Sequence, residues 1–340
     1  MTAPAIENQS FRAYRLHQGA AQPEGRIVEM RVGELSPGDV VIRVAYSSIN
    51  YKDALAAAGR NSIVREYPRI GGIDLVGTVA SSTDPRFQPG EPVVVHGFGI
   101  GVDHDGGHAG YARVKGDWVL PLPVGLSLLE AATIGAAGYT AGYLLHLMEL
   151  NGLEPGQGPV LVTGATGGVA SVAIDMLATR GYEIAALTSK RDAAESLRAL
   201  GASQVLLHDE LKMGDRPLEK GLWAGAVDSL GGATLSWLTR TMLPGGVITA
   251  FGNAAGADIS TTVMPFILRG IRLIGVNANS PMPVRQAVWA KIAGEYRPRR
   301  LEAIATVIGL EELPERFSRM LEGRSRGRVV VRMDHPDSTR

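Results

Sequence analysis

The 340-residue sequence contains no cysteine. That absence excludes disulfide bonds, thiolate catalysis and the zinc sites that are built with cysteine ligands. There is also no excess of charge of one sign, because 34 basic residues balance 34 acidic ones. This balance excludes a global electrostatic footprint for nucleic acid or a membrane surface. No apolar run approaches the roughly 18 residues of a membrane span, and the first residues lack an apolar signal core. We therefore expect a cytoplasmic protein.

Glycine is abundant instead, with 43 residues, and one glycine cluster has a distinctive setting. Residues 160–163 (VLVT) predict a buried strand, Gly164 to Gly168 a tight turn, and Val169 to Arg180 a helix. This order is typical of dinucleotide binding, because a phosphate approaches a backbone without Cβ atoms and the helix N-terminus supplies free N–H groups. An ordinary strand-to-helix turn is the alternative.

The segments after this turn alternate between strand and helix. Further strands are predicted at residues 183–188, 204–207, 226–229, 247–251 and 273–276. We therefore expect an α/β fold with a Rossmann-type, doubly wound parallel sheet.

The segments before it predict a different architecture. Short strands with turn-rich spacing, such as 40–45 and 110–114, indicate a partly open β-barrel. A last strand at 328–332 is expected to return to it. We therefore predict a discontinuous catalytic domain (1–135 and 278–340) into which a dinucleotide-binding Rossmann domain (136–277) is inserted.

The end of the second Rossmann strand indicates which dinucleotide is bound. NAD-binding chains usually place a carboxylate there for the ribose 2′-OH, whereas this chain has Thr188, Ser189, Lys190 and Arg191. Two cations and two hydroxyls suit a 2′-phosphate and therefore favour NADPH. A solvated helix start is the alternative.

The order of these parts resembles the medium-chain dehydrogenase/reductase superfamily, whose catalytic domain is GroES-like. The resemblance is carried by GGIDLVGTV (71–79), AATIGAAGYTA (131–141), VLVTGATGGVAS (160–171) and GRVVV (327–331). SSINYKDALA (47–56), ARVKGDW (112–118), LEKGLWAGAVDS (218–229) and TTVMPFILRGIRLIGV (261–276) are similar to the YhdH-type quinone oxidoreductases, also described as NADPH-dependent acrylyl-CoA reductases.

The resemblance implies NADPH-dependent reduction of the C=C bond of a short enoyl thioester, acrylyl-CoA to propionyl-CoA, by hydride transfer to the β-carbon. A quinone or small-enone oxidoreductase of the same fold is the first alternative. A nucleotide-binding protein without turnover is the second. The resemblance also implies a homodimer in which the sixth strand pairs across a two-fold axis.

The resemblance further implies chemistry without zinc. Asn50 stands where the zinc-dependent members have a cysteine, and Ile73-Asp74 where they have a His-Glu pair. We expect Asp74 to anchor Lys52 or the turn beside it. Three histidines, His96, His104 and His108, together with Asp103 and Asp105 are ligand types for a metal, but their place in a Gly-rich segment favours a mobile loop.

Without a Lewis acid, hydrogen-bond donors must stabilise the enolate-like oxygen, and a proton must reach the α-carbon. Tyr51 and Asn50 are the candidates, because they lie on the strand-to-helix turn that replaces the metal-ligand segment. Tyr51 would touch the nicotinamide ribose and donate a hydrogen bond, and Asn50 would orient the ring or the substrate. For both, an ordinary turn residue is the alternative.

Other cofactor contacts are implied at positions that match the superfamily. For the pyrophosphate they are Thr166, Gly167, Gly168 and Val169. For the 2′-phosphate and adenosine they are Ser189, Lys190, Arg191 and His208. For the rest of the cofactor they are Phe251, Gly252, Asn253, Val276, Asn277 and Arg328, with core packing as the alternative for Phe251 and Val276.

Overall fold

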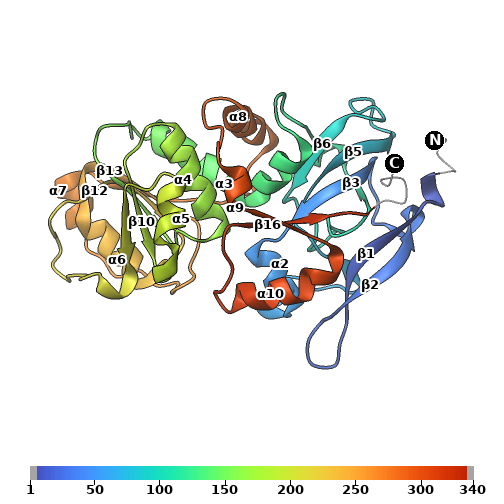
Figure 1. Ribbon diagram of the computed structural model, residues 1–340, viewed down its shortest axis with the longest axis horizontal. Coiled ribbons are helices and arrows are strands. Elements are labelled where there is room, and N and C mark those ends of the chain that lie inside the picture. Colours follow the sequence, from blue (N-terminus) through green and yellow to red (C-terminus); the bar gives the residue numbers. More distant parts are fainter. Residues whose placement is uncertain (1–5, 335–340) are drawn as a thin grey trace. The chain divides into compact units, whose positions relative to one another are not determined.

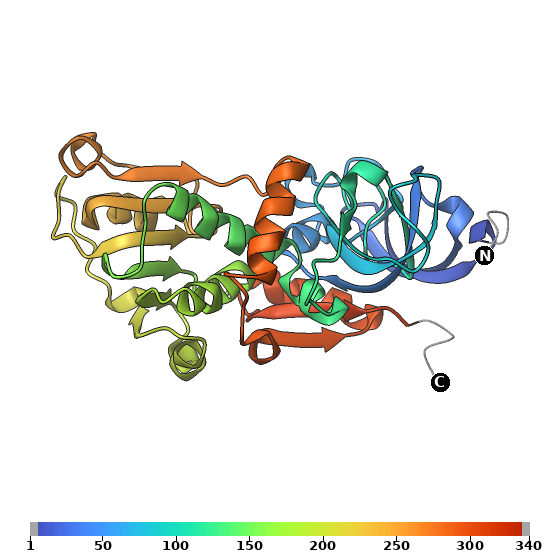
Figure 2. The same cartoon turned by 90° about the horizontal axis from the view of Figure 1, so that it is seen from above.

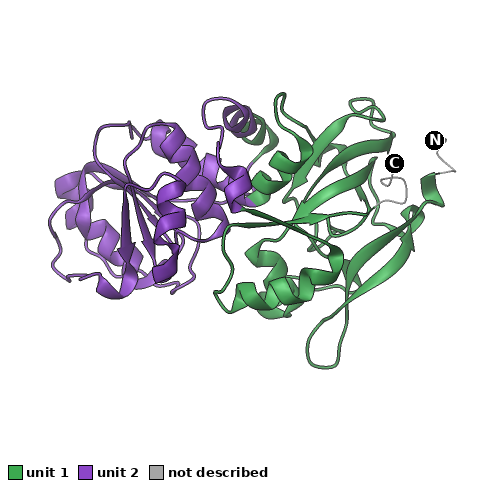
Figure 3. Ribbon diagram, viewed as in Figure 1, with its two compact units in different colours: residues 1–136, 281–286, 305–340 green, residues 137–280, 287–304 purple. Residues whose placement is uncertain are grey.

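The computed structural model describes residues 6–334. The chain forms two compact units (Figure 3). Unit 1 takes in the residues up to 136, residues 281–286 and the residues from 305 onwards, and unit 2 comprises residues 137–280 and 287–304. Residues 287–304, expected in the discontinuous domain, therefore pack within unit 2.

Unit 1 is built mainly of strands. A three-stranded sheet has the order β2-β1-β4, with β1 (Ser10–His17), β2 (Glu24–Arg31) and β4 (Arg69–Ile70). The larger sheet has the order β15-β16-β3-β5-β6-β8, with β7 paired to β3. Its strands are β3 (Val40–Ser48), β5 (Asp74–Ser82), β6 (Pro92–His96), β7 (Tyr111–Val114), β8 (Leu120–Pro121), β15 (Ala305–Ile308) and β16 (Arg328–Arg332).

A short break separates β4 from β5. The break falls at Gly71 and Gly72, where Gly72 has φ +97°. That left-handed conformation is open to glycine and ends the strand.

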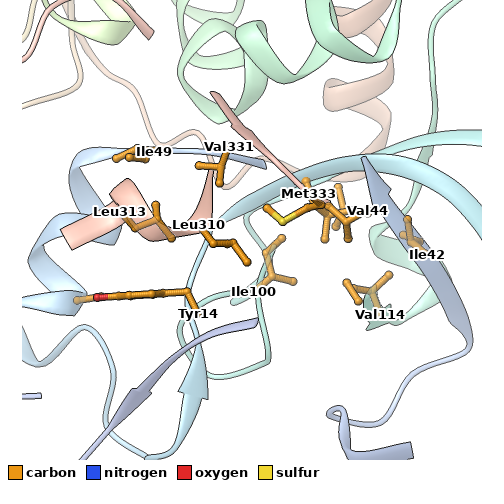
Figure 4. Close-up of a cluster of buried hydrophobic side chains, with 14 of the residues drawn as sticks. Tyr14, Ile42, Val44, Ile49, Ile100, Val114, Leu310, Leu313, Val331 and Met333 are labelled. Atoms are coloured by element: carbon orange, nitrogen blue, oxygen red, sulfur yellow. The ribbon is translucent and has the colours of Figure 1, made fainter. Parts of the chain in front are cut away.

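The last strand returns to the β-rich unit, as predicted. β16 pairs antiparallel with β3, with Val330 opposite Ser48 and Val331 opposite Ser47. Figure 4 shows how its end joins the core: Val331 and Met333 lie with Ile42 and Val44 of β3. The first and last thirds of the chain thus share one hydrophobic core.

Short helices complete unit 1. The α-helices are α2 (Tyr51–Ala57) and α10 (Leu313–Leu321). The 3-10 helices are η1 (Val32–Glu34), η2 (Arg60–Ser62), η3 (Gly116–Trp118) and η6 (Leu310–Glu312).

Unit 2 contains a six-stranded parallel sheet in the order β11-β10-β9-β12-β13-β14. Its strands are β9 (Val160–Thr163), β10 (Ile184–Thr188), β11 (Gln204–Leu207), β12 (Trp223–Asp228), β13 (Met242–Ala250) and β14 (Arg272–Gly275). β9, β10 and β12 are buried along their whole length, as a sheet covered on both faces requires. This arrangement confirms the predicted Rossmann sheet, and Figure 2 shows its strands side by side.

Helices cover both faces of this sheet. α4 (Gly168–Thr179) and α5 (Ala194–Ala199) lie on one face, and α6 (Gly232–Thr241) lies on the other (Figure 1). The remaining elements are α7 (Met264–Arg269), α9 (Leu301–Ile304), η4 (Arg191–Ala193) and η5 (His208–Glu210).

Two helices contain residues of both units, α3 (Leu128–Leu150) and α8 (Met282–Ala293). α3 is interrupted at Gly135, which has φ 49° and ψ −155°. Within residues 6–334, the helices are all too short or too polar to cross a membrane.

Candidate active site

The parallel sheet of unit 2 brings several predicted residues to one edge. β9 and β12 are neighbours, yet the chain continues from β9 toward β10 and from β12 toward β13, in opposite directions along the sheet. This is a topological switch point, the place where open α/β sheets bind ligands at the carboxyl ends of their strands. The predicted glycine turn follows β9 at this point.

The glycine turn has the backbone that a diphosphate requires. Gly164 has φ +58°, and a Cβ atom there would lie 2.4 Å from Ser229 Oγ. Gly167 is exposed and extended, and α4 begins at Gly168. The first N–H groups of a helix have no intrahelical partner and carry partial positive charge. Gly167 N donates to Gly164 O (2.8 Å) and closes the turn. Gly167 and Gly168 leave the backbone without side chains, and the first N–H groups of α4, at Gly168 and Val169, point out of the helix end, which fits a nucleotide pyrophosphate.

A buried carboxylate that the sequence analysis did not single out supports this turn. Asp228, the last residue of β12, accepts hydrogen bonds from Thr163 Oγ1 (2.8 Å) and Gly231 N (2.8 Å). Thr163 Oγ1 in turn accepts from Ser229 N (2.9 Å). Burial raises the pKa of Asp228. Asp228 could have been predicted from the sequence, because it is an acidic residue at the end of a buried strand that lies at the switch point of the sheet.

The predicted 2′-phosphate residues lie after the next two strands. Ser189, Lys190 and Arg191 follow β10, and His208 follows β11, its neighbour in the sheet. Ser189 and Arg191 are exposed, whereas His208 Nε2 lies 3.3 Å from Thr234 Oγ1. Arg191 forms ion pairs with two acids of η5 that the sequence did not suggest as partners, Asp209 and Glu210.

The predicted residues of the last two strands reach the same edge. Phe251, Gly252 and Asn253 follow β13, and Phe251 N donates to Asp228 O (3.0 Å). Val276 and Asn277 follow β14, and Val276 N donates to Ala250 O (2.9 Å). A Cβ atom on Gly252 would lie 2.6 Å from Ser229 O, so only glycine fits there without a shift. Thr166 is half-buried in the glycine turn.

Tyr51 and Asn50 lie in unit 1, on the turn between β3 and α2, and differ in their surroundings. Tyr51 is the first residue of α2 and is 53% exposed, and its hydroxyl has no partner in the described part of the chain. Asn50 is 9% exposed, donates from Nδ2 to Asp74 Oδ2 (2.9 Å) and accepts at Oδ1 from Arg328 Nη1 (3.3 Å). Only Tyr51 is free to contact a ligand, and Asn50 belongs to the support of the turn.

Asp74 anchors this turn. Its carboxylate accepts from Ser48 N (2.8 Å), Ser48 Oγ (2.6 Å) and Ala136 N (2.9 Å), in addition to Asn50. Lys52 is exposed, so of the two anchoring roles expected for Asp74 the structure selects the turn.

Arg328 is buried beside Asp74, with 2% of its surface exposed. It donates from Nε to Thr133 O (2.8 Å), from Nη1 to Ile49 O (3.2 Å) and from Nη2 to Ser48 Oγ. Burial lowers its pKa, and Asp74, at 4.0 Å, opposes that shift. The structure differs here from the expected cofactor contact, because the guanidinium is engaged by oxygens of unit 1.

Asp53 lies behind the same turn and accepts from Asn50 N (2.8 Å) and Ile73 N (3.0 Å). Burial and the neighbouring Asp74 raise the pKa of Asp53 to about 7. Two adjacent buried carboxylates disfavour each other's charge, so Asp53 takes up a proton close to neutral pH.

The histidines of the Gly-rich segment have structural partners. His96 accepts from Arg285 Nη1 (2.7 Å), His104 Nε2 lies 3.0 Å from Pro37 O, and His108 Nδ1 lies 3.1 Å from Ser47 Oγ. All three are buried, His96 at the end of β6 and the other two in the Gly-rich segment, which we expected to be a mobile loop. Across residues 6–334 there is no group of three or more His, Asp or Glu residues that could hold a metal ion.

Comparisons with known proteins agree with this geometry. The family model for the alcohol dehydrogenase GroES-like domain matches residues 36–124, and that for zinc-binding dehydrogenase matches residues 168–294. AcuI of Ruegeria pomeroyi, an acrylyl-CoA reductase, is 41% identical over 314 residues, 92% of this chain and 95% of AcuI.

Two further relatives have solved structures. YhfP of Bacillus subtilis, named as a quinone oxidoreductase, is 44% identical over 95% of this chain and 99% of YhfP. Its structure with NAD bound has a TM-score of 0.93 and covers 96% of this chain and 100% of that one. The YhdH oxidoreductase of Salmonella enterica in complex with NADP has a TM-score of 0.92 and 41% identity, covering 95% of this chain and all of its own. The chain belongs to the medium-chain dehydrogenase/reductase superfamily, in its YhdH-type branch.

Proposed function

We propose that this protein reduces the C=C bond of acrylyl-CoA, giving propionyl-CoA, with NADPH as cofactor. The observation that carries the proposal is the glycine turn at the switch point of unit 2, where Gly164 and Gly167 leave the backbone bare before the N-terminus of α4. The 41% identity to an acrylyl-CoA reductase supports the choice of substrate.

We assign the cofactor to residues at the carboxyl edge of the unit 2 sheet. Thr166, Gly167, Gly168 and Val169 hold the pyrophosphate, and Ser189, Lys190, Arg191 and His208 hold the adenosine end. Phe251, Gly252, Asn253, Val276 and Asn277 border the remainder, because all follow strands whose ends share this edge. When bound, NADPH supplies the hydride that adds to the β-carbon. Arg328 is a positioning residue, because its guanidinium holds the turn between β3 and α2 through hydrogen bonds to Ser48, Ile49 and Asn50.

Tyr51 is the proposed catalytic residue. Its hydroxyl is exposed and unpartnered in the described structure, so it can donate a hydrogen bond to the thioester oxygen as negative charge develops there. Asn50 keeps the turn in place through its bonds to Asp74 and Arg328. The chain's own donors thus stand at the position where zinc-dependent relatives place a metal ligand.

A quinone oxidoreductase is the second candidate, favoured by the name of YhfP, which is 44% identical to this chain. A single assay separates the candidates: NADPH consumption with acrylyl-CoA, crotonyl-CoA and a benzoquinone. The proposal expects the highest kcat/KM with acrylyl-CoA. A higher value with the quinone would support the second candidate, and tight NADPH binding without turnover would indicate a nucleotide-binding protein.

We also propose a cytoplasmic homodimer. β14 is the last strand in the order of its sheet, and α7, which precedes it in the chain and contacts β13, carries the exposed apolar residues Met264, Ile267 and Leu268, preceded by Val263. An edge strand with apolar neighbours suits pairing with a second copy. The proposed domains are a catalytic domain of residues 1–135 and 278–340 and a nucleotide-binding domain of residues 136–277, with the exception that residues 287–304 pack within unit 2.

A further inference from the structure

We propose that Asp209 and Glu210 set the nucleotide preference of this protein, by competing with the ribose 2′-phosphate for Arg191. The proposal rests on the proposed nucleotide site of unit 2 and adds residues that none of its assigned contacts include. It predicts that NADPH is preferred over NADH only weakly.

The geometry of Arg191 carries the argument. Arg191 Nη1 donates to Glu210 Oε1 (2.7 Å), and Arg191 Nη2 donates to Asp209 Oδ2 (2.6 Å). The two terminal nitrogens that would grip a phosphate bidentately are therefore both engaged by carboxylates. The acids come from η5, which follows β11, and Arg191 begins η4, which follows the neighbouring strand β10.

The charged residues that follow β10 and β11 do not strongly favour binding of the 2′-phosphate. Lys190 and Arg191 supply two positive charges, whereas Asp192, Asp209 and Glu210 supply three negative ones. A phosphate monoester adds about −1.5 to −2 at neutral pH. A 2′-phosphate that approaches Arg191 must therefore displace two carboxylates and remain close to them.

The competition weakens phosphate binding without preventing it. The side chains of Arg191, Asp209 and Glu210 are 60%, 65% and 61% exposed. Exposed ion pairs are weak, because solvent screens them and the side chains lose entropy in forming them. A carboxylate released from Arg191 can also accept a hydrogen bond from a free ribose 2′-OH, as the acid of NAD-binding chains does. Such an acid favours NADH.

The test is a titration of both reduced nucleotides, followed by protein fluorescence at one fixed ionic strength. The variant is Asp209→Asn with Glu210→Gln. The matched control is Glu183→Gln with Asp215→Asn, which removes the same charge from two other exposed positions of unit 2. We expect the variant to bind NADPH about 5- to 30-fold more tightly than the unchanged protein, with NADH binding equal or weaker. The control should shift neither dissociation constant more than about twofold.

Arg191→Ala completes a double-mutant cycle. Because the competition acts through Arg191, the acid replacements should raise the NADPH-to-NADH ratio clearly less in the Arg191→Ala background, where only the direct effects of the two carboxylates remain. The same gain in both backgrounds, or no gain in either, would overturn the proposal. If the unchanged protein binds neither nucleotide, the proposed function itself fails. Binding of both with an unaltered ratio would refute only the role of the acids.

Discussion

At the scale of single residues, the turn between β3 and α2 combines one exposed side chain, that of Tyr51, with a buried group of polar residues that supports it. Tyr51 faces solvent, whereas Asn50, Asp53, Asp74 and Arg328 are buried and bonded to one another or to the backbone. Because these buried residues already hold the turn in place, the proposed role of Tyr51 requires little reorganisation of the protein when a ligand binds.

Tyr51→Phe should therefore lower activity while leaving stability unchanged. The substitution removes only an exposed hydroxyl without a partner in the described structure. We expect kcat with acrylyl-CoA to fall about 10²-fold, in the range of a lost oxyanion donor, and the melting temperature to stay the same. Retention of kcat in this variant would contradict the catalytic role of the Tyr51 hydroxyl.

Arg328→Met should destabilise unit 1. It leaves Asp74 buried without its cation and frees Thr133 O and Ile49 O, which now accept from the guanidinium. We expect the free energy of unfolding to fall by about 3–5 kcal/mol in urea titrations. Arg332→Met on the same strand is exposed and should cost less than about 0.5 kcal/mol. Equal losses in the two variants would contradict a role for the buried network.

Asp53 gives a pH dependence of known sign. Its pKa is raised to about 7 in the fold, so between about pH 4 and 7 the folded state holds a proton that the unfolded state has released. Stability contributed by this group is therefore lost as the pH rises through that window. Asp53→Asn cannot ionise, so its urea midpoint relative to the unchanged protein should rise between pH 5 and 8, by the equivalent of about 2 kcal/mol. Asp117→Asn, at an exposed site, should show no such difference.

At the scale of elements, the turn after β9 requires glycine at position 164. Gly164→Ala combines a positive φ with a Cβ atom 2.4 Å from Ser229 Oγ. We expect NADPH affinity to fall at least about tenfold and stability by about 1–3 kcal/mol, measured by fluorescence titration and urea. Gly181, at φ +83° with nothing within 4 Å of a built Cβ, provides the control. Gly181→Ala should cost only about 1 kcal/mol and leave NADPH binding intact.

The elements also show what the sequence could predict. Buried strands such as β9 and β10 can be predicted directly from the sequence, because a sheet covered on both faces needs unbroken apolar runs. β15 was missed, since two of its four residues, Thr306 and Val307, are exposed and no alternation marks it.

The site was predictable only in part for a similar reason. The glycine turn has a local signature, so it was found from neighbouring residues. Asp228 under the turn, Arg328 beside Asp74, and the two acids on Arg191 depend on partners 18 or more positions away along the chain. No local pattern encodes such pairings.

At the scale of the whole molecule, the exposed face of α7 yields a prediction on assembly. Ile267 is 71% exposed and Leu268 59% exposed, on the helix that contacts β13 and precedes the last strand of the unit 2 sheet. Ile267→Glu would bury a charge if a second copy covers this face, so we expect sedimentation to show monomers at concentrations where the unchanged protein is dimeric. Val124→Glu, at a site 97% exposed, should leave the dimer intact. A monomeric starting protein would refute the proposed homodimer.

The position of β16 has a consequence for how the chain is made. β16 lies between β15 and β3 inside the larger sheet of unit 1, and its residues 328–332 are synthesised after all of unit 2. A nascent chain leaving the ribosome can therefore complete the parallel sheet of unit 2 while β3 still lacks its neighbour β16. This edge of β3 must stay free of wrong partners until translation is nearly over, which makes it the segment on which a chaperone would act.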